Sequence, residues 1–461
     1  MTVPAAQNNF LEAPIPKLYL TTATPLLLIM ATSGFMTLAD AWFLGTYVGA
    51  DALTAVTLMF PPFMMLVAMM TLVGNGMASK LARARGAADR EAANAIFTAA
   101  HGLALSMCVL TGLVFLTGGD GMVLAMARND HALGDMGYTY LAILVAGTPM
   151  SFLLSVHLDA LRTEGRAGGA ALLTVFASLA NLALNYLLIV EYSLGVAGSA
   201  VGTVAAQGLA LSLAIVLRIR QRTSLSRLTI NPADWFGGWV RIIALGAPQS
   251  LSFLGISLVS AAIIYSLQNW ADDQYPVIVA AYGILTRIMT FLYLPMIAVA
   301  LAMQTITGNN LGALAHKRVD ASLRFALLLI GVYCLTMEAV VFLSRDWIGS
   351  VFVDDVTVIS EVGRIAPFLL LLYPVAGLSI ILASHFQASG EASRAAFLAL
   401  PKAYLFSIPL VLLLPIVFGE KGIWYAMPMS DIGMVLIGAG VLFFSARKTG
   451  RRLGLFLTAR T

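Results

Sequence analysis

Residues 25–53 read PLLLIMATSGFMTLADAWFLGTYVGADAL, and this stretch decides the fold. No charged residue occurs from residue 18 to residue 39, and Asp40 then lies near the far end of the apolar run. About 20 predominantly apolar residues are enough to cross the hydrocarbon core of a bilayer. The stretch therefore predicts a membrane-spanning helix over residues 18–46 with one carboxyl group inside it. Because a charged side chain at the centre of such a helix costs about 2.5–3.5 kcal/mol on insertion scales, Asp40 is a candidate for function.

The same apolar character runs through all 461 residues. Hydrophobic residues make up 59% of the chain and charged residues only 11%, whereas about a quarter of the residues of a soluble domain are charged. No polar segment is long enough to form a catalytic domain outside the membrane. The N-terminus lacks the residue order of a cleaved signal peptide, so the first helix is expected to remain. Composition thus predicts an all-α membrane protein that is not an enzyme, with Cys108 and Cys334 as packing residues.

Twelve apolar runs, separated by glycine, proline and charged residues, predict twelve transmembrane helices. They cover residues 18–46, 52–80, 92–117, 135–161, 169–190, 197–219, 240–270, 277–309, 321–344, 362–388, 394–418 and 422–445. Of the 27 Lys and Arg residues, 22 fall near the tails and even-numbered connections, Lys402 among them, and 4 fall in the odd-numbered connections. The positive-inside rule then predicts a multi-pass protein of the cell inner membrane with both termini in the cytoplasm. The basic residues indicate topology, so no nucleic-acid partner is expected.

The two halves of the chain repeat the same proline and glycine landmarks. The pairs are separated by 223 to 226 residues. They are Pro25 and Pro248, Gly86 and Gly312, Pro149 and Pro374, Gly165 and Gly390, and Gly198 and Gly422. Each half holds six spans, so both halves enter the membrane in the same orientation. Transporters with such parallel repeats bind substrate between the halves and alternate their access.

This repeat predicts two parallel six-helix bundles related by a pseudo-two-fold axis along the membrane normal. The N-lobe is expected over residues 1–222, a cytoplasmic connector over 223–239, and the C-lobe with a basic cytoplasmic tail over 240–461. No motif points to an obligate oligomer, so a monomer in the lipid bilayer is expected.

Four further polar residues are expected at the depth of Asp40. Asn181 and Asn185 are four residues apart in span five, so they share one helix face. Thr203 lies in span six and Tyr140 in span four. At 1.5 Å per residue, all five groups lie about 8–13 Å below the periplasmic surface. Their oxygen atoms suit a proton or Na⁺ and no other metal or cofactor; alternatively, the Asn and Thr side chains only join neighbouring helices.

Two other hypotheses concern residues away from this group. Arg287 and Glu338 lie inside spans eight and nine and are expected to form a structural ion pair in the second half. Pro25 lies fifteen residues before Asp40, where a proline removes one backbone hydrogen bond and permits a kink. We therefore expect Pro25 to act as a hinge whose bending responds to the charge state of Asp40.

These residues resemble the multidrug and toxic compound extrusion (MATE) family over nearly the whole chain. Residues 25–53 are similar to the first-helix pattern of that family, in which a proline precedes an aspartate and a glycine-rich turn. NLALNYLLIVEYSLGVAGSAVGTVAAQ (181–207) resembles its fifth and sixth helices, and FQASGEASRAAFLALPKAYLFSIPLVLLLPIVFGEKGIWYAMPMSD (386–431) its tenth to twelfth. The resemblance implies efflux of amphipathic, often cationic organic compounds in exchange for H⁺ or Na⁺. By position it implies a cation site at Asp40, Asn181, Asn185 and Thr203, with Tyr140 beside it and Pro25 as the bending proline.

Departures from the family pattern indicate a branch within it. DinF-like members often have a second aspartate at the position of Asn185, so here the site keeps one carboxylate. NorM-like members have an acid in helix seven, where this chain has Gly255, and an aspartate in helix ten, which the segment QASGEAS lacks. The resemblance is therefore nearer to the DinF-like branch, with coupling in the N-lobe.

The sequence accordingly predicts a cation-coupled antiporter that exports lipophilic, often cationic small molecules. The alternative within transport is a dedicated exporter or flippase, for a peptide–polyketide metabolite or a lipid-linked precursor. A flippase is expected to place several basic residues within the spans, and Arg287 is the sole candidate by sequence. A membrane enzyme would need paired catalytic groups inside the membrane, and no such motif occurs. A channel or scaffold would not need the repeat.

Overall fold

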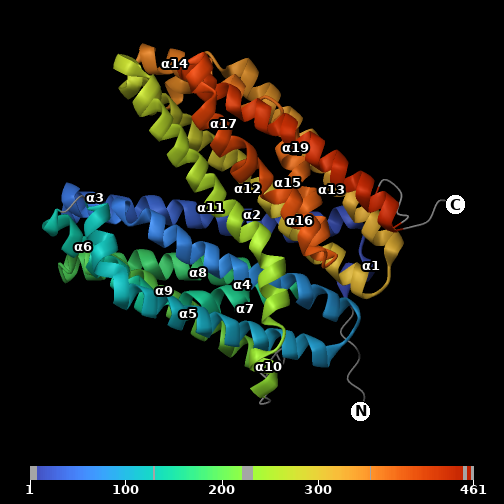
Figure 1. The fold of residues 1–461 in the computed structure, drawn as a ribbon. Coiled ribbons are helices and arrows are strands. Elements are labelled where there is room, and N and C mark those ends of the chain that lie inside the picture. The colour runs from blue at the N-terminus through green and yellow to red at the C-terminus, as the bar shows by residue number, and fades with distance from the viewer. Residues whose placement is uncertain (1–7, 128–129, 221–231, 354, 450–453, 458–461) are drawn as a thin grey trace. The chain divides into compact units, whose positions relative to one another are not determined.

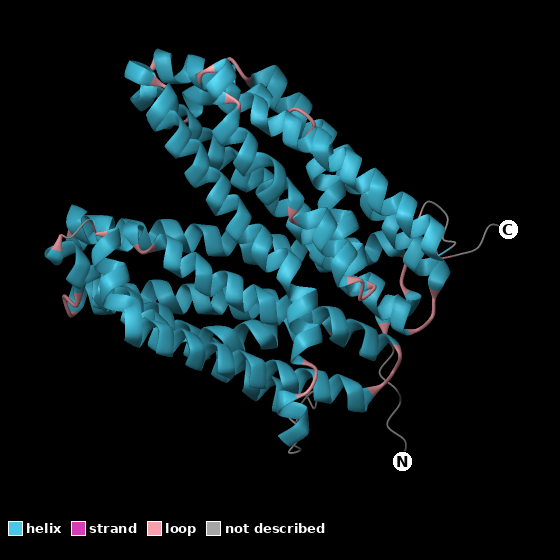
Figure 2. Ribbon diagram, in the orientation of Figure 1, coloured by secondary structure: helices cyan, strands magenta, loops and turns pink. Residues whose placement is uncertain are grey.

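The computed structural model describes residues 8–127, 130–220, 232–353, 355–449 and 454–457 (Figure 1). Helices joined by short loops make up almost all of this described part (Figure 2). Within it, 10 helices are long and apolar enough to span a membrane, and two bent helix pairs raise the number to 12. The prediction of an all-α membrane protein with twelve spans is confirmed.

The chain divides into two compact units by its internal packing. Unit 1 contains the residues up to Phe10 and Leu20–Ser250, and unit 2 contains Leu11–Tyr19 and the residues from Leu251 onward. The chain therefore passes between the units after Phe10, after Tyr19 in the first span and after Ser250 in the seventh span. The predicted connector 223–239 lies partly outside the described residues, and its role as a lobe boundary stays a prediction.

The helices of unit 1 follow the order of the first six spans. They are α1 (Asn9–Glu12) and α2 (Ile15–Phe43), whose residues each straddle the two units, and then η1 (Leu44–Val48), α3 (Ala50–Leu58), α4 (Phe60–Gly86), α5 (Arg90–Met126), α6 (His131–Ala146), α7 (Thr148–Thr163), α8 (Ala167–Asn185), η2 (Tyr186–Glu191), α9 (Gly195–Arg220), α10 (Pro232–Phe236) and the first part of α11 (Trp239–Trp270).

Unit 2 continues from α11 and repeats the pattern. Its helices are η3 (Asp272–Gln274), α12 (Tyr275–Gly312), α13 (His316–Ser344), η4 (Ile348–Val351), α14 (Val356–Leu370), α15 (Tyr373–Ala388), α16 (Ala392–Ala399), η5 (Lys402–Ser407), α17 (Ile408–Leu413), α18 (Pro415–Phe418) and α19 (Glu420–Thr449).

The turns of the two units repeat as the sequence landmarks do. Ala88 and Leu314 adopt φ of 57° and 58° at the turns after spans two and eight. Gly165 and Gly390 adopt φ of 79° and 81° at the turns after spans four and ten. Positive φ is uncommon for residues with a Cβ atom, so its recurrence at matching positions shows that the two halves share one backbone plan.

Spans two, four and ten are each broken or bent. Residues 52–80 form two helices, because α3 ends at Leu58 and Pro61 and Pro62 occupy the first turn of α4, where a missing N–H is tolerated. Span four bends by 49° between α6 and α7, and span ten bends by 43° between α14 and α15. In both bent spans a proline, Pro149 or Pro374, lies in the first turn after the break.

Candidate functional site

The centre of the site is the carboxyl group of Asp40, three residues before the end of α2. Asn185, the last residue of α8, donates a hydrogen bond from its amide nitrogen to Asp40 Oδ1. Asn185 has no exposed surface, whereas Asp40 is only partly buried. An ionised carboxylate needs donors when water is removed, and the amide supplies one. The site therefore holds an acid that keeps some access to its surroundings.

Asn181 extends this contact to α9. The orientation of an asparagine amide is assigned from its hydrogen-bonding partners. With Nδ2 donating to Asp40 Oδ1 at 3.2 Å, the amide oxygen of Asn181 accepts from the backbone N–H and the hydroxyl of Thr203, both at 3.2 Å. The structure thus brings together four of the five predicted residues: Asp40, Asn181, Asn185 and Thr203.

Tyr140, the fifth predicted residue, lies beside the other four without a hydrogen bond to them. Its hydroxyl interacts electrostatically with Asp40, and its ring packs against a cluster that includes Phe43, Leu44 and Ile189. This apolar cluster lies immediately beyond Asp40 and Asn185 in the chain. It limits water on that side of the carboxyl group.

A π-helical turn follows each of the two central residues. η1 begins four residues after Asp40, and η2 begins directly after Asn185. Such turns insert an extra residue into the helical repeat and are frequent at functional sites. Here η1 follows α2, which carries Asp40, and η2 follows α8, which carries Asn185. The two side chains therefore meet close to the point where each α-helix becomes a π-helical turn.

Close packing of α9 fixes the position of Asn185. A Cβ atom at Gly202 would lie 2.5 Å from Asn185 Oδ1. Gly202→Ala is therefore expected to displace the Asn185 amide and reduce gradient-driven transport several-fold, at a stability cost of about 1–3 kcal/mol. Gly208→Ala in the same helix is the control, because its new methyl group would meet Met150 at an ordinary 3.7 Å.

Transport in proteoliposomes and thermal unfolding in detergent together check this prediction. The Gly208→Ala protein is expected to match the parent protein in both measurements. Equal transport by the Gly202→Ala and Gly208→Ala proteins would show that the position of the Asn185 amide has no bearing on transport.

The ion pair predicted between Arg287 and Glu338 does not form among the described residues. Glu338 instead accepts a hydrogen bond from the backbone N–H of Leu372. Leu372 has φ of 67° and lies at the break between α14 and α15. Glu338 therefore satisfies a backbone donor that the bend of span ten leaves without a helical partner.

A different ion pair lies within the spans of unit 2. Lys402 Nζ lies 2.5 Å from Asp431 Oδ1, and the Asp431 side chain is 4% exposed. Lys402 opens the π-helical turn η5, ten residues after α16 begins, so it lies inside the eleventh span and its assignment to a connection is corrected. Sequence position alone missed this pair, although the presence of Asp431 in span twelve was a usable signal.

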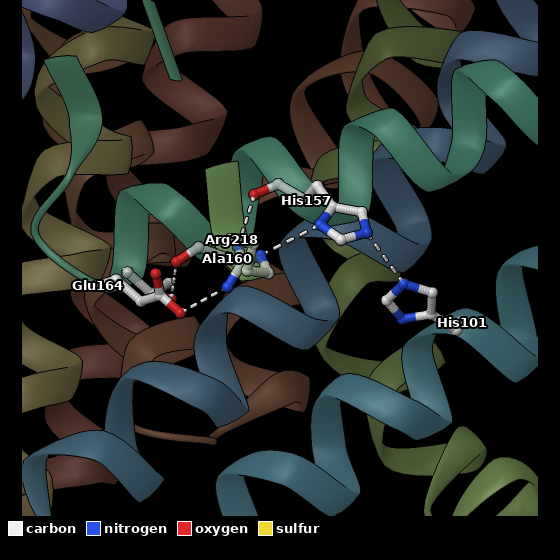
Figure 3. Close-up of polar contacts among 6 residues, drawn as sticks. His101, His157, Ala160, Glu164 and Arg218 are labelled. Atoms are coloured by element: carbon white, nitrogen blue, oxygen red, sulfur yellow. Dashed lines mark hydrogen bonds and ion pairs between the residues drawn. The ribbon is translucent and has the colours of Figure 1, made fainter. Parts of the chain in front are cut away.

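A second buried polar network joins α5, α7 and α9 in unit 1 (Figure 3). Arg218 Nη1 lies 2.8 Å from Glu164 Oε1, and the two side chains are 4% and 3% exposed. Arg218 Nε donates to His157 Nδ1 at 3.2 Å, and His157 Nε2 lies 3.4 Å from His101 Nε2. The His101 Nδ1 atom lies 2.8 Å from the carbonyl of Phe97. The two histidines form a pair, although their positions in the sequence are unrelated.

One assignment of protons satisfies every hydrogen bond that links Arg218, the two histidines and the Phe97 carbonyl. The Arg218 donor requires His157 Nδ1 to be an acceptor, so a neutral His157 carries its proton on Nε2. His101 Nε2 then accepts that proton, and His101 Nδ1 donates to the Phe97 carbonyl. Each bond has one donor and one acceptor only when both rings are neutral. The network therefore fixes the three helices in one arrangement.

Comparison with known proteins agrees with this architecture. The MatE family model matches residues 25–187 and 248–413, two segments that begin 223 residues apart as the internal repeat does. The chain is 25% identical over 96% of both chains to the FAD transporter of Shewanella oneidensis. It is 21% identical over 92% of both chains to the multidrug export protein MepA of Staphylococcus aureus.

Solved structures give the same fold. The crystal structure of a MATE transporter in complex with MaL6 superposes with a TM-score of 0.84 at 21% identity, covering 97% of this chain and 99% of that one. An outward-facing MATE transporter of the MOP superfamily superposes with a TM-score of 0.85 at 20% identity, covering 97% and 99%. Because the family model matches most of the sequence in both halves, the chain belongs to the MatE family of multidrug and toxic compound extrusion transporters.

Proposed function

We propose that this transporter is a cation-coupled antiporter that exports amphipathic organic compounds by alternating access. The supporting observation is the setting of Asp40, a partly buried carboxyl group that receives the amide groups of Asn185 and Asn181 inside the first unit. An intramembrane acid with polar partners is typical of proton and ion relays. The multidrug export relatives agree with drugs as substrates.

The donor arrangement favours a proton over Na⁺ as the coupling ion. Both amides direct N–H groups at Asp40, and the Asn181 oxygen is engaged by Thr203. A sodium ion needs several oxygen ligands, so both amides would have to turn over before it could bind. A proton needs only one free lone pair on the carboxylate. The assignment of coupling to the first unit also follows the nearer resemblance to the DinF-like branch.

The proposed cycle follows from the charge of Asp40. The distribution of basic residues supports cytoplasmic termini in an inner-membrane protein. In the proposed cycle a proton enters from outside and neutralises the carboxylate. Loss of the charge releases the Asn185 and Asn181 amides and permits α2 to bend at Pro25, which lies inside that helix. Each pH unit across the membrane supplies about 1.4 kcal/mol per proton, and the membrane potential adds about 2.3 kcal/mol per 100 mV only when the exchange carries a net charge. Substrate leaves before the halves return inward.

Proteoliposomes with separately imposed gradients test this function. An imposed H⁺ gradient, but not a Na⁺ gradient, is expected to drive uphill movement of a lipophilic cation. Uphill movement with Na⁺ alone would overturn the choice of proton. Equal movement without either gradient would overturn coupling itself.

A second candidate is a dedicated exporter of an anionic metabolite. The FAD transporter matches over 96% of both chains, and Lys402 provides a basic group within the spans of unit 2. The double variant Lys402→Ala, Asp431→Ala removes both charges together and avoids leaving either one uncompensated. If the physiological substrate is anionic, this variant is expected to lose FAD transport and keep export of a lipophilic cation. Unchanged transport of both compounds would exclude a role for the pair in substrate selection.

A further inference from the structure

Three basic side chains meet where α4 packs against the start of α11. The Lys80 ammonium lies close to Gly238, since a Cβ atom on this glycine would be 2.9 Å from Lys80 Nζ. Lys80 is repelled by Arg83 and Arg241, and Arg83 is repelled by Arg241. The three charges therefore lie near enough to one another to be mutually unfavourable.

Nothing in the described part of the chain compensates these charges. No carboxylate there lies within ion-pair distance of Lys80, Arg83 or Arg241, whereas Arg218, Arg364 and Arg394 each have such a partner. Lys80 and Arg83 are also partly buried. Partly buried like charges without a partner are unfavourable, so their retention here points to an anion supplied from outside the chain.

Close backbone contact holds the cluster in place. A Cβ atom at Gly246 would lie 1.9 Å from the Leu72 carbonyl oxygen, and one at Gly76 would lie 2.0 Å from the Ile242 carbonyl oxygen. With Lys80 beside Gly238, these contacts step by four residues in opposite directions along the two helices. The basic groups thus extend from an antiparallel, glycine-packed crossing that leaves them little freedom to move apart.

The start of α11 adds positive potential to the same place. The Gly238 carbonyl accepts from the backbone N–H groups of Arg241 and Ile242, so it caps a helix of 32 residues. The N-terminal end of a helix carries a partial positive charge, and a cation is unfavourable there. The Lys80 ammonium lies at this end, and no carboxylate of the described residues pairs with it.

The surroundings of the cluster are those of a membrane interface. Phe236 and Val240, on either side of Gly238, are 69% and 83% exposed. The Trp239 indole donates to the carbonyls of Ala99 and Trp235, at 3.1 and 2.8 Å, which fixes this corner against α5. Exposed apolar side chains beside unpaired basic groups suit a molecule with acyl chains and a phosphate. The acyl chains can contact the apolar side chains while the phosphate contacts the basic groups.

We propose that Lys80, Arg83 and Arg241 bind the phosphate group of an anionic phospholipid. The proposed lipid site lies in the part of α11 that belongs to unit 1, because Arg241 is nine residues before Ser250, the last residue of that unit. The chain passes from unit 1 to unit 2 along α11. Lipid binding at the start of α11 therefore stabilises its packing against α4. The site is independent of Asp40 and of the coupling ion.

Nanodiscs of phosphatidylcholine with a small fraction of phosphatidylglycerol test the proposal. The full-length protein is expected to retain phosphatidylglycerol, as measured by native mass spectrometry and by titration with a fluorescent analogue. The triple variant Lys80→Gln, Arg83→Gln, Arg241→Gln is expected to bind it about a hundredfold more weakly, since each basic residue contributes about a fivefold factor near an anionic surface. Arg241→Gln alone, at an exposed position, tests the fivefold step in a protein with an intact fold.

The matched control removes three charges elsewhere. Lys317, Arg220 and Lys448 are exposed, and the triple variant Lys317→Gln, Arg220→Gln, Lys448→Gln is expected to bind phosphatidylglycerol as the parent protein does. Equal losses in both triple variants would mean that only net charge matters, and would overturn a specific site. Unchanged binding in the Lys80, Arg83 and Arg241 variants would overturn it as well. Binding of inorganic phosphate in pure phosphatidylcholine nanodiscs, together with displacement of phosphatidylglycerol by phosphate in the mixed nanodiscs, would show that the site binds a free anion. That result would overturn the proposal of a lipid site.

Discussion

Replacing Asp40 by Asn is expected to abolish uphill export while the protein stays inserted and folded. Asparagine has nearly the same size and keeps an oxygen that can accept from the Asn185 amide, but it cannot gain or lose a proton. Exchange of one proton for one monovalent cation carries no net charge, so the pH difference is the driving force, and each pH unit supplies about 1.4 kcal/mol, which corresponds to a substrate gradient of about tenfold. In the Asp40→Asn protein this gradient is expected to fall to unity, as only downhill exchange remains.

The measurement is the steady-state ratio of a fluorescent lipophilic cation across proteoliposomes with an imposed H⁺ gradient. Asp51→Asn provides the control, because it makes the same chemical change at an exposed residue in the first turn of α3. It is expected to sustain the full gradient. A normal gradient in the Asp40→Asn protein would place coupling at another residue and would refute the proposed cycle.

Replacing Arg218 by Met is expected to lower the free energy of unfolding by about 3 kcal/mol. The Glu164 and Arg218 side chains are both nearly inaccessible, and removal of one partner of a buried pair leaves an uncompensated charge that costs about 3–5 kcal/mol. The lower end of that range applies because Arg85 also attracts Glu164. The loss would also remove the donor to His157, so the contact between α7 and α9 weakens at two points.

Thermal or denaturant unfolding in detergent measures this effect. Arg220→Met in the same helix is the control, because Arg220 is exposed and such a change is expected to alter stability by less than about 0.5 kcal/mol. The double variant Arg218→Met, Glu164→Gln is expected to recover part of the loss, because neither charge then remains unpaired. No recovery in the double variant would show that packing of the arginine stem, and not its charge, dominates.

The two buried polar centres of unit 1 differ in what they can do. The hydrogen bonds of Arg218 with the two histidines fit one proton arrangement, and with Glu164 these residues join three helices (Figure 3). Asp40 keeps some exposure and is held by amides that can turn. In the proposed cycle the network of Arg218 stays fixed while Asp40 changes charge, so the two centres have different roles.

The sequence by itself determined the number of spans, the repeat and the residues of the Asp40 site. Apolar runs of bilayer length, paired prolines and glycines, and the spacing of Asn181 and Asn185 are properties of single helices, so they can be read along the chain. Depth along a helix follows from its rise per residue, and this was sufficient to select residues of α2, α8 and α9 that do meet.

Only the tertiary structure decided which side chains meet across helices. Arg287 and Glu338 lie inside consecutive spans and were predicted to pair, but they do not. Lys402 instead pairs with Asp431, and Glu338 accepts from the backbone of Leu372. Likewise, the positive-inside pattern contains Lys80, Arg83 and Arg241 without revealing that they converge. Helical periodicity gives the face of a residue on its own helix; the rotation of each helix against its neighbours depends on close packing at glycines such as Gly76 and Gly202, which no single helix encodes.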